Sequence, residues 1–433
     1  MSLSRPLRVT VVLGVVAGLV LTLPALPASA ATASGGPARY IPDPNAYAPS
    51  QSTLAAGPTD LAVSAYSALI VHPSTNQVTQ IALCMPKSCL PGQPYQSAVP
   101  GTPTAVAVGA AARVAYVATQ ATDSVVVLAL PQYGISTTSP ATVTTTVPVG
   151  SHPGAVALNP AGSALYVANS GGNSVSVIST ATNLVTATIP VGSAPLGVAV
   201  SPAGDRVYVA NSQGGSVSVI DASANSVMAT VPVGAGPTGV AAAGSRVFVT
   251  NSGAGTLSII DAATNTVATT VPVGMQPRGV VARTDGATVF VANAGSGTVS
   301  VVDPARALVV ATVTVGGSPQ AVAFGGSDSA YVTDSTANTL SVIPTRAPAL
   351  AVNWSSRRST RTVTGVVPQI GAVAYGIVAR NGNRTRRGTC AARGSANIAC
   401  TVRLPRGRWR VSVTTQLPWQ NGTSGNQNRT FRF

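Results

Sequence analysis

Short apolar runs, each ended by turn-forming residues, recur at a nearly fixed interval along most of the chain. In the segment that starts at Gly192 the runs are Gly197–Ser201, Arg206–Asn211, Ser216–Asp221 and Val227–Val233. Each run is five to seven residues long, rich in β-branched residues and bounded by Gly, Asn, Asp or Pro, which is typical of strands. The segment therefore predicts four short strands joined by tight turns.

The same four-run unit repeats along the chain. Units begin at Gly150, Gly192, Gly234, Gly274 and Gly316, at spacings of 42, 42, 40 and 42 residues, and looser copies begin at Gly101 and Gly57. A period near 42 with four strands is the signature of a propeller blade. Because one four-stranded sheet cannot bury both of its faces, we expect seven units to close around an axis. The predicted fold class is all-β: a seven-bladed β-propeller over residues 57–345, followed by a small β-sandwich over residues 346–433.

The second run of each unit carries a specific motif. It reads YVAN at 166–169 and 208–211, FVTN at 248–251, FVAN at 290–293 and YVTD at 331–334. These motifs, with the SVID, SIID and SVVD runs that end at Asp221, Asp261 and Asp303, resemble the YVTN β-propeller repeat family. The resemblance implies a propeller. It leaves function open, because that family includes surface-layer proteins, secreted binding proteins and lactonase-like or lyase-like enzymes. The first two units depart from the motif, with LIVH at 69–72 and Thr119 in place of Asn.

The seventh unit lacks a fourth run. Its three runs lie near 321–324, 330–333 and 340–343, and Pro344, Arg346 and Pro348 follow at once. The N-terminal segment 31–56 precedes the first unit, and its part Arg39–Leu54 is a candidate for the missing strand. We therefore expect a strand from that segment to close the ring.

The first 30 residues have the pattern of an export signal. Arg5 and Arg8 precede the apolar run Val9–Leu23, and an A-x-A cleavage site ends at Ala30, as in a removable secretory peptide. The apolar run is short for a membrane span, which needs roughly 20 residues, although an uncleaved anchor is the alternative. We expect a secreted, extracellular protein that associates with the cell surface and has no transmembrane span after cleavage.

Charge is unevenly distributed. The chain holds no Glu, 24 Arg, one Lys and ten Asp, and its net charge is +15. Residues 1–345 are neutral in sum, whereas residues 346–433 contain 15 Arg and no acidic residue. Alternating runs at Thr360–Val367, Val373–Ala379, Ile398–Leu404, Trp409–Thr415 and Thr430–Phe433 predict a small antiparallel sandwich. The segment resembles bacterial Ig-like or fibronectin-III-like modules.

A field of one sign attracts polyanions and is screened by salt. The expected partner is an anionic cell-envelope polymer or a surface protein, with no specific nucleic acid. The alternative is a sandwich whose polar faces use Arg without binding anything. The candidate anion-binding residues are Arg357, Arg358, Arg384, Arg386, Arg387, Arg406, Arg408 and Arg410.

The four cysteines form two close pairs, Cys84 with Cys89 and Cys390 with Cys400. An even number of cysteines in an exported chain favours disulfides. A metal site is the rival interpretation, but neither pair has neighbouring His or Cys to complete a tetrahedral set. We predict two local disulfides and neither metal nor cofactor.

No catalytic set is evident from the sequence. The two histidines, His72 and His152, lie in no metal-spaced cluster, and no G-x-S-x-G elbow precedes a helix. The lactonase-like and lyase-like members of the resembling family imply sites that use Glu, His and metal, and Glu is absent here. We therefore predict a non-enzymatic binding or scaffold protein, with a lactonase-like or lyase-like enzyme acting through His152 and Arg278 as the alternative.

The loops that lead from one unit to the next are the best candidate ligand site, because they should surround the mouth of the central channel. Their variable residues include Thr102 and Ser318, and the candidate ligand-binding residues are His152, Gln276, Arg278 and Gln320. The Asn or Asp that ends each second run is interpreted as a turn residue. Six further aspartates should lie on the opposite face, where they could dock the basic sandwich: Asp205, Asp221, Asp261, Asp285, Asp303 and Asp328.

Overall fold

A computed structural model describes residues 50–432, apart from gaps at 65–66, 83–94, 110–112, 132–139, 326–328, 346–352, 358, 369–373, 393–396 and 417–423. The predicted signal peptide, Cys84, Cys89, Arg358 and Asp328 therefore lie outside the described residues. Among the described residues, no helix is long and apolar enough to span a membrane.

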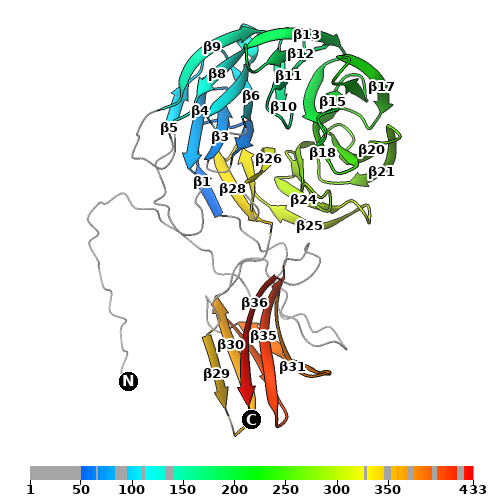
Figure 1. Cartoon of the computed structure of the whole chain (residues 1–433). Coiled ribbons are helices and arrows are strands. Elements are labelled where there is room, and N and C mark those ends of the chain that lie inside the picture. The colour runs from blue at the N-terminus through cyan, green and yellow to red at the C-terminus, as the bar shows by residue number, and fades with distance from the viewer. Residues whose placement is uncertain are drawn as a thin grey trace, which may run out of the picture. The chain divides into compact units, whose positions relative to one another are not determined.

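Seven four-stranded antiparallel sheets form blades 1 to 7 around a common axis (Figure 1). Blades 1 to 3 are built from β2 (Asp60–Val63), β3 (Ser67–His72), β4 (Gln77–Ala82) and β5 (Tyr95–Ala98); β6 (Pro103–Val108), β7 (Val114–Thr119), β8 (Ser124–Ala129) and β9 (Thr142–Pro148); and β10 (Pro153–Leu158), β11 (Ala164–Asn169), β12 (Ser174–Ser179) and β13 (Leu184–Pro190). A short 3₁₀ helix, η2 (Gln120–Thr122), joins β7 to β8.

Blades 4 to 6 have the same order. They are built from β14 (Pro195–Val200), β15 (Arg206–Asn211), β16 (Ser216–Asp221) and β17 (Ser226–Pro232); β18 (Pro237–Ala243), β19 (Arg246–Asn251), β20 (Thr256–Asp261) and β21 (Thr266–Pro272); and β22 (Pro277–Ala282), β23 (Val289–Asn293), β24 (Thr298–Asp303) and β25 (Leu308–Thr314). The predicted all-β propeller is thereby confirmed.

Blade 7 combines the two ends of the propeller segment. It contains β26 (Pro319–Gly325), β27 (Ser329–Asp334) and β28 (Thr339–Pro344), and its outer strand is β1 (Ser50–Thr53), which pairs antiparallel with β28. Ser50–Thr53 falls inside the segment that the sequence singled out for this role. Contacts between β2 and both β6 and β26 complete the circle. The pairing with β1 gives blade 7 its fourth strand and covers the edge of β28.

First strands crowd together at the axis, and small residues make this possible. A Cβ added at Gly197 would lie 2.1 Å from the carbonyl oxygen of Thr238, and one at Gly239 would lie 2.2 Å from that of Arg278. These distances are far below van der Waals contact, so only Gly is accommodated at these two positions. The glycine in the Gly-Val pair of each of these strands is thus a consequence of the close approach of neighbouring blades.

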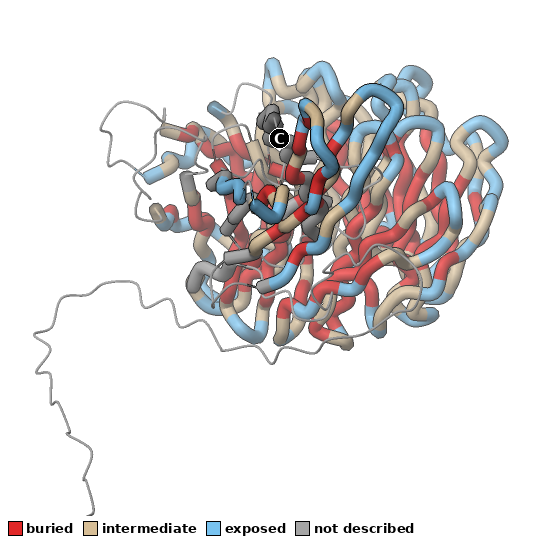
Figure 2. Tube along the Cα trace, turned by 90° about the horizontal axis from the view of Figure 1, so that it is seen from below, coloured by how far each residue is buried: buried red, intermediate tan, exposed pale blue. Residues whose placement is uncertain are grey.

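Burial follows the position of each strand within its blade (Figure 2). The second and third strands are buried almost throughout, as in β11 and β12, whereas the outer strand β13 exposes five of its seven residues. The aromatic residue of the repeated motif belongs to the interior, since Tyr208 and Phe248 are fully buried. Each buried side chain of this size contributes about 1.5–3 kcal/mol to folding, so the ring is stabilised mainly between blades.

The C-terminal residues form a sandwich of two four-stranded sheets, β29-β30-β34-β33 and β32-β31-β35-β36. The strands are β29 (Asn353–Arg357), β30 (Thr362–Pro368), β31 (Ala374–Asn381), β32 (Arg384–Arg387), β33 (Thr389–Ala392), β34 (Asn397–Arg403), β35 (Arg408–Gln416) and β36 (Ser424–Arg432). The sequence pattern missed β29, β32 and β33, which are short and carry little apolar alternation. It also placed the start of β36 six residues late, at Thr430.

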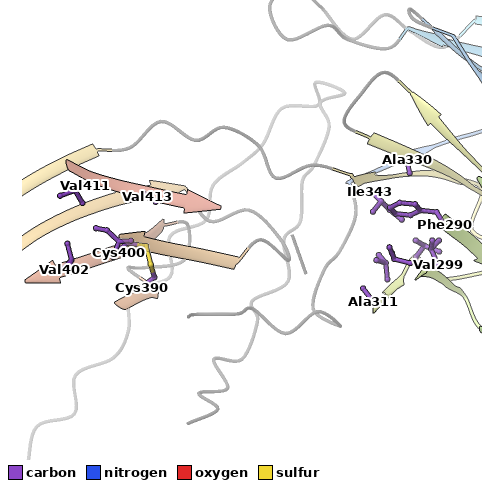
Figure 3. Packing of buried hydrophobic residues seen from close by; sticks show 14 of the residues in the cluster. Phe290, Val299, Ala311, Ala330, Ile343, Cys390, Cys400, Val402, Val411 and Val413 are labelled. Carbon is purple, nitrogen blue, oxygen red and sulfur yellow. A yellow bond between two sulfur atoms is a disulfide. The ribbon is translucent and has the colours of Figure 1, made fainter. Parts of the chain in front are cut away.

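Both sheets contribute to one core, in which Trp409, Val411 and Val402 are buried (Figure 3). Cys390 and Cys400 face each other across β33 and β34 and form a disulfide. The prediction of that bridge is confirmed.

Candidate functional site

The strand order gives the propeller two distinct ends. Each blade runs from its innermost first strand outward, so the connections between blades and the connections between second and third strands share one end, the mouth face. The connections between first and second strands and between third and fourth strands share the other end, the turn face. All four candidate ligand-binding residues lie at the mouth face.

Most mouth loops place a residue in the left-handed conformation directly before the proline that starts the next blade. This residue is Gly57, His152, Ala194, Gly236 or Gln276, with φ between 47° and 63°. The conformation disfavours residues with a Cβ, so His152 and Gln276 hold a strained backbone. Such strain at a non-glycine residue is a feature that clusters at functional positions.

Hydrogen bonds from the preceding blade hold the loops at His152 and Ala194. The backbone N–H of His152 donates to Oδ1 of Asp123 at 2.7 Å, and the N–H of Ala194 donates to Oδ1 of Asn173 at 2.8 Å. Because Ala194 receives the same support without a functional side chain, Asp123 has a scaffold role here. It contacts the backbone of His152 and leaves the imidazole free of a carboxylate.

The side chain of His152 is exposed, and among the described residues it pairs with its neighbour Ser151 alone. Its Nδ1 lies 2.8 Å from Oγ of Ser151, and its carbonyl oxygen accepts a hydrogen bond from Oγ of Ser170 at 2.8 Å. A nucleophilic triad requires a base that is oriented by a third group through its other ring nitrogen. The described residues supply no such third group for His152.

The other candidates lie across the mouth. Gln276 and Arg278 are exposed on blade 6, while Gln320 is half-buried on blade 7 at the position equivalent to Arg278. Nε2 of Gln320 donates to Oγ of Ser318 at 2.8 Å and to Oγ of Ser335 at 3.1 Å, so its amide is already engaged. Arg278 and Gln320 are therefore on adjacent blades, whereas His152 is on blade 3, three blades away from Arg278.

The remaining mouth-loop residues that vary between repeats, Thr102 and Ser318, support the backbone. The carbonyl oxygens of Thr102 and Ser318 accept the N–H groups of Gln120 and Ser335. They are half-buried. Of the candidate ligand-binding residues, His152, Gln276 and Arg278 are thus the exposed ones.

The asparagine that ends each second strand is neither an exposed turn residue nor a ligand. Asn169, Asn211, Asn251 and Asn293 are fully buried. The amide of Asn211 donates to Oγ of Ser216 and Oγ of Ser218 at 3.1 and 3.0 Å, and the other three make the equivalent pair of bonds. For these four asparagines the turn interpretation is corrected, since their amides tie the second strand to the third. Asp334 does act in a turn, because its Oδ1 accepts the N–H groups of Thr336 and Ala337 at 3.0 and 2.8 Å.

A carboxylate that the sequence reasoning missed lies on the innermost strand of blade 1. Asp60 occupies the position that is Ala or Gly in every other blade, and its Oδ2 accepts the N–H of Val106 in blade 2 at 3.0 Å. Burial raises the pKa of the Asp60 carboxyl to about 6. The signal was present in the sequence as the one acidic residue at that repeat position.

The described aspartates expected at the turn face lie there, and backbone N–H groups of the turns donate to the carboxylates of Asp221, Asp261, Asp285 and Asp303. Oδ1 of Asp221 accepts from Ser223 and Ala224, which lowers the pKa of Asp221 with the hydroxyl of Ser223 as the largest cause. Asp261, Asp285 and Asp303 make similar turn bonds. These carboxylates stabilise turns.

The sandwich presents an arginine face, defined here as Arg380, Arg387, Arg408 and Arg410. The buried residues Ile377, Ala379, Trp409 and Val411 fix the inner side of β31 and β35, so the alternate positions face outward. Arg380 and Arg410 are direct cross-strand partners. Arg387 is the cross-strand partner of Val378, which lies two residues before Arg380 on the same side of β31. All four arginines are exposed.

Among the other candidate anion-binding residues, Arg357, Arg384, Arg386 and Arg406 are exposed as well, on β29, on β32 and in the loop before β35. Arg384 and Arg386 point to the opposite side of β32 from Arg387, because side chains alternate along a strand. Arg380 was missed by the sequence reasoning. Its membership of the face depends on its pairing with Arg410, which no local pattern encodes.

Within the described residues, no three His, Cys or Asp side chains gather as they would around a metal ion. The described part of the mouth offers hydrogen-bond donors, the guanidinium of Arg278, the imidazole of His152 and the exposed carboxylate of Asp123, which suits binding of a polar group.

Comparisons with known proteins agree on the fold. Residues 95–233 match the family "Lactonase, 7-bladed beta-propeller", and residues 234–347 match the family "YNCE-like beta-propeller". No curated protein matches the chain. Among solved structures, "Kuenenia stuttgartiensis Hydrazine Synthase" is similar at 21% identity and a TM-score of 0.58, over 67% of this chain and 96% of that one. At that identity the likeness concerns the propeller fold alone.

Proposed function

We propose that this protein is a secreted, non-enzymatic propeller of the YVTN type that binds at the cell surface, where its basic C-terminal module, Ig-like or fibronectin-III-like, attaches to anionic envelope polymers. The observation that carries the proposal is the arginine face. The propeller mouth would then be free to bind a further ligand or surface protein.

The pairing of Arg380 with Arg410 supports an external anion. Like charges directly opposite each other across two antiparallel strands destabilise a sheet. Residues 346–433 contain no acidic side chain that could relieve this repulsion. Anionic groups from another molecule would relieve it, and a polymer with regularly spaced charges would reach several arginines at once.

Arginine suits this role better than lysine. Its planar guanidinium presents five donors and forms bidentate hydrogen bonds to phosphate and carboxylate groups. The chain uses 24 Arg and a single Lys, and every basic residue of the sandwich is Arg. The face is therefore suited to phosphate-bearing or carboxylate-bearing polymers.

Compartment is consistent with this proposal. The signal-like N-terminus would direct export, and the Cys390–Cys400 disulfide is of the kind that persists in an oxidising environment. Envelope polymers with dense negative charge would be the first polyanions that such a protein meets.

The test is co-sedimentation of the mature chain, residues 31–433, with isolated cell envelope and with vesicles containing phosphatidylglycerol. We expect binding in 0.05 M salt and release by 0.5 M salt, because the Debye length falls to roughly 4 Å at the higher concentration. The triple variant Arg380→Gln/Arg408→Gln/Arg410→Gln should sediment at least tenfold less. Binding to envelope but not to vesicles would identify a wall polymer as the ligand.

The matched control removes the same charge from the propeller. Arg113 and Arg306 are exposed there and Arg283 is half-buried. Arg283 and Arg306 form ion pairs with Asp285 and Asp303 at 3.6 and 3.5 Å. The variant Arg113→Gln/Arg283→Gln/Arg306→Gln should sediment like the unmodified protein. Equal loss in both triple variants, or binding that resists salt, would contradict a specific role of the arginine face.

A second candidate is an enzyme acting at the mouth through His152 and Arg278. The match of residues 95–233 to a lactonase family favours it. The test is hydrolysis of simple γ- and δ-lactones with and without divalent metal. Turnover that His152→Ala abolishes would replace the non-enzymatic proposal.

A further inference from the structure

The fifth repeat is two residues shorter than its neighbours, and the structure shows where they are missing. In blade 4, β14 and β15 are joined by residues 201–205, whereas in blade 5 the longer β18 is joined to β19 by Gly244 and Ser245 alone. Gly244 has a φ of 56°, which lets this short turn close. The reduced turn leaves space at the turn face between blades 4 and 5.

That space is a cavity of about 310 Å³. Its apolar wall includes Pro202, Ala242 and Val247, and its polar wall includes Ser201, Asp205, Arg206, Tyr208 and Arg246. The volume lies at the lower end of the range for small-molecule pockets, ≈ 300–1,000 Å³, and is roughly ten times the share of one water molecule in the liquid.

Arg246 is the charged residue of the lining whose side chain is left without a bonded partner among the described residues. No hydrogen bond or ion pair joins its guanidinium to any of the residues that the structure describes. Its cross-strand partner by register is Asp261, whose Oδ1 already accepts the N–H groups of Ala263 and Thr264 at 2.8 and 3.2 Å. Asp261 does not line the cavity. A half-buried cation without a bonded anion is a favourable place for an anionic ligand.

The remaining polar groups are arranged around it. The guanidinium of Arg206 donates to the carbonyl oxygen of Ala262, which fixes its plane at the cavity wall. The carboxylate of Asp205 accepts a hydrogen bond from Oγ of Ser201 at 2.6 Å. Burial raises the pKa of Tyr208, so its hydroxyl keeps its proton and remains able to donate.

We propose that this interblade cavity binds a small organic monocarboxylate, with the carboxylate held by Arg246 and Arg206 and the apolar part packed on Pro202 and Ala242. Two guanidinium groups and one carboxylate give the lining a net charge of one positive unit, which matches a single negative charge. A phosphate dianion would bring excess negative charge beside Asp205. The site lies at the turn face and is independent of both the mouth and the arginine face.

The probe is benzoate, with benzamide as its neutral isostere, and the readout is isothermal titration of the mature chain. We expect one benzoate site and no measurable benzamide binding. Arg246→Gln should weaken benzoate binding at least tenfold, while Arg283→Gln, which removes a half-buried arginine from blade 6, should leave the affinity unchanged. Circular dichroism would establish that both variants are folded.

A second variant tests the cavity without removing charge. Replacing Gly244-Ser245 by the four-residue Pro-Ala-Gly-Asp turn of blade 4 should fill the space and abolish benzoate binding. Absence of benzoate binding to the unmodified protein, equal affinity for benzamide, or unchanged affinity in Arg246→Gln would each overturn the proposal. Tighter binding of inorganic phosphate than of benzoate would overturn the assignment to a monocarboxylate.

Discussion

The backbone N–H of Gly57 donates a hydrogen bond of 2.7 Å to Oδ1 of Asn338, a residue 281 positions later in the chain. The carbonyl oxygen of Asn338 also accepts the N–H of Leu54 at 2.8 Å. Asn338 therefore joins blade 7 to the segment between β1 and blade 1. Elsewhere in the ring the same side-chain contact, from Asn173 to Ala194, joins two blades that are consecutive in sequence.

The contact at the ring junction predicts a specific effect of Asn338→Gly. Asn338 and Asn173 both have left-handed backbone, and Gly occupies the equivalent position in three other blades, so this change removes the acceptor without straining the chain. We expect a loss of about 1 kcal/mol in the free energy of unfolding, with faster hydrogen exchange of the β1 amides. Asn173→Gly should cost a similar amount without affecting β1. Equal exchange of β1 in the two variants would contradict a closing role for Asn338.

Replacing one of the buried asparagines should lower the free energy of unfolding more than the change at the ring junction does. Asn211→Ala removes two hydrogen bonds to Ser216 and Ser218 and leaves a small cavity, so we expect a loss of about 2–3 kcal/mol on thermal or denaturant unfolding. The exposed neighbour Gln213 serves as the control, and Gln213→Ala should change stability by less than about 0.5 kcal/mol. A neutral Asn211→Ala would mean that the repeated asparagine has no structural role.

From the burial of Asp60 we expect the free energy of unfolding to fall as the pH rises. Burial raises its pKa from 3.8 to about 6, so the unfolded chain loses the proton more readily than the folded one. The resulting loss in the free energy of unfolding is absent below pH 3.8, grows as the pH rises to 6 and is complete above it. It amounts to about 1–3 kcal/mol, given that the residue is only half-buried. Asp60→Asn should therefore raise the melting temperature at pH 8 and leave it unchanged near pH 3.5. Exposed Asp285→Asn should show no such dependence, and a parallel response of the two variants would refute this account of Asp60.

From the burial of His72 we expect the opposite pH dependence, with a free energy of unfolding that falls as the pH decreases. Its ring is fully buried, and this burial lowers its pKa below 6.5, against the smaller raising effect of hydrogen bonds to the backbone of Ala56 and Ala55. The unfolded chain then binds the proton more readily, so stability is complete above pH 6.5 and decreases as the pH falls below it. His72→Asn restores the residue found at this position in other blades and should reduce the loss between pH 6.5 and 5. Urea unfolding at several pH values would reveal the difference, and identical pH profiles would exclude His72 as the cause.

Much of the fold follows from the periodic pattern. The repeat spacing fixes the number of blades, and the alternation of Arg408 and Arg410 with Trp409 and Val411 fixes which side of β35 faces solvent. These features are local, so one strand or one repeat is enough to show them. The short, largely polar strand β32 lacks that alternation, which is why the pattern missed it.

The site features that sequence reasoning missed arise between repeats. Arg206 and Arg246 line one cavity although they are 40 residues apart, and Arg380 meets Arg410 only after β31 pairs with β35. Asp60 stands out when the seven repeats are aligned, but its raised pKa results from burial, which only the packed blades provide. Contacts of this kind require the register between blades, which hydrophobic periodicity does not specify.

The pairing of β1 with β28 also constrains the order of events during synthesis. The first strand to leave the ribosome finds its partner only when the last blade has been made, so closure is a late step that spans almost the whole propeller and carries the slow kinetics of distant contacts. Until then the edge of β28 is open, and the N-terminal arm of a second molecule offers the same four residues. Crowded nascent chains could thus exchange arms and emerge as intertwined dimers with the same strand pairings as the monomer.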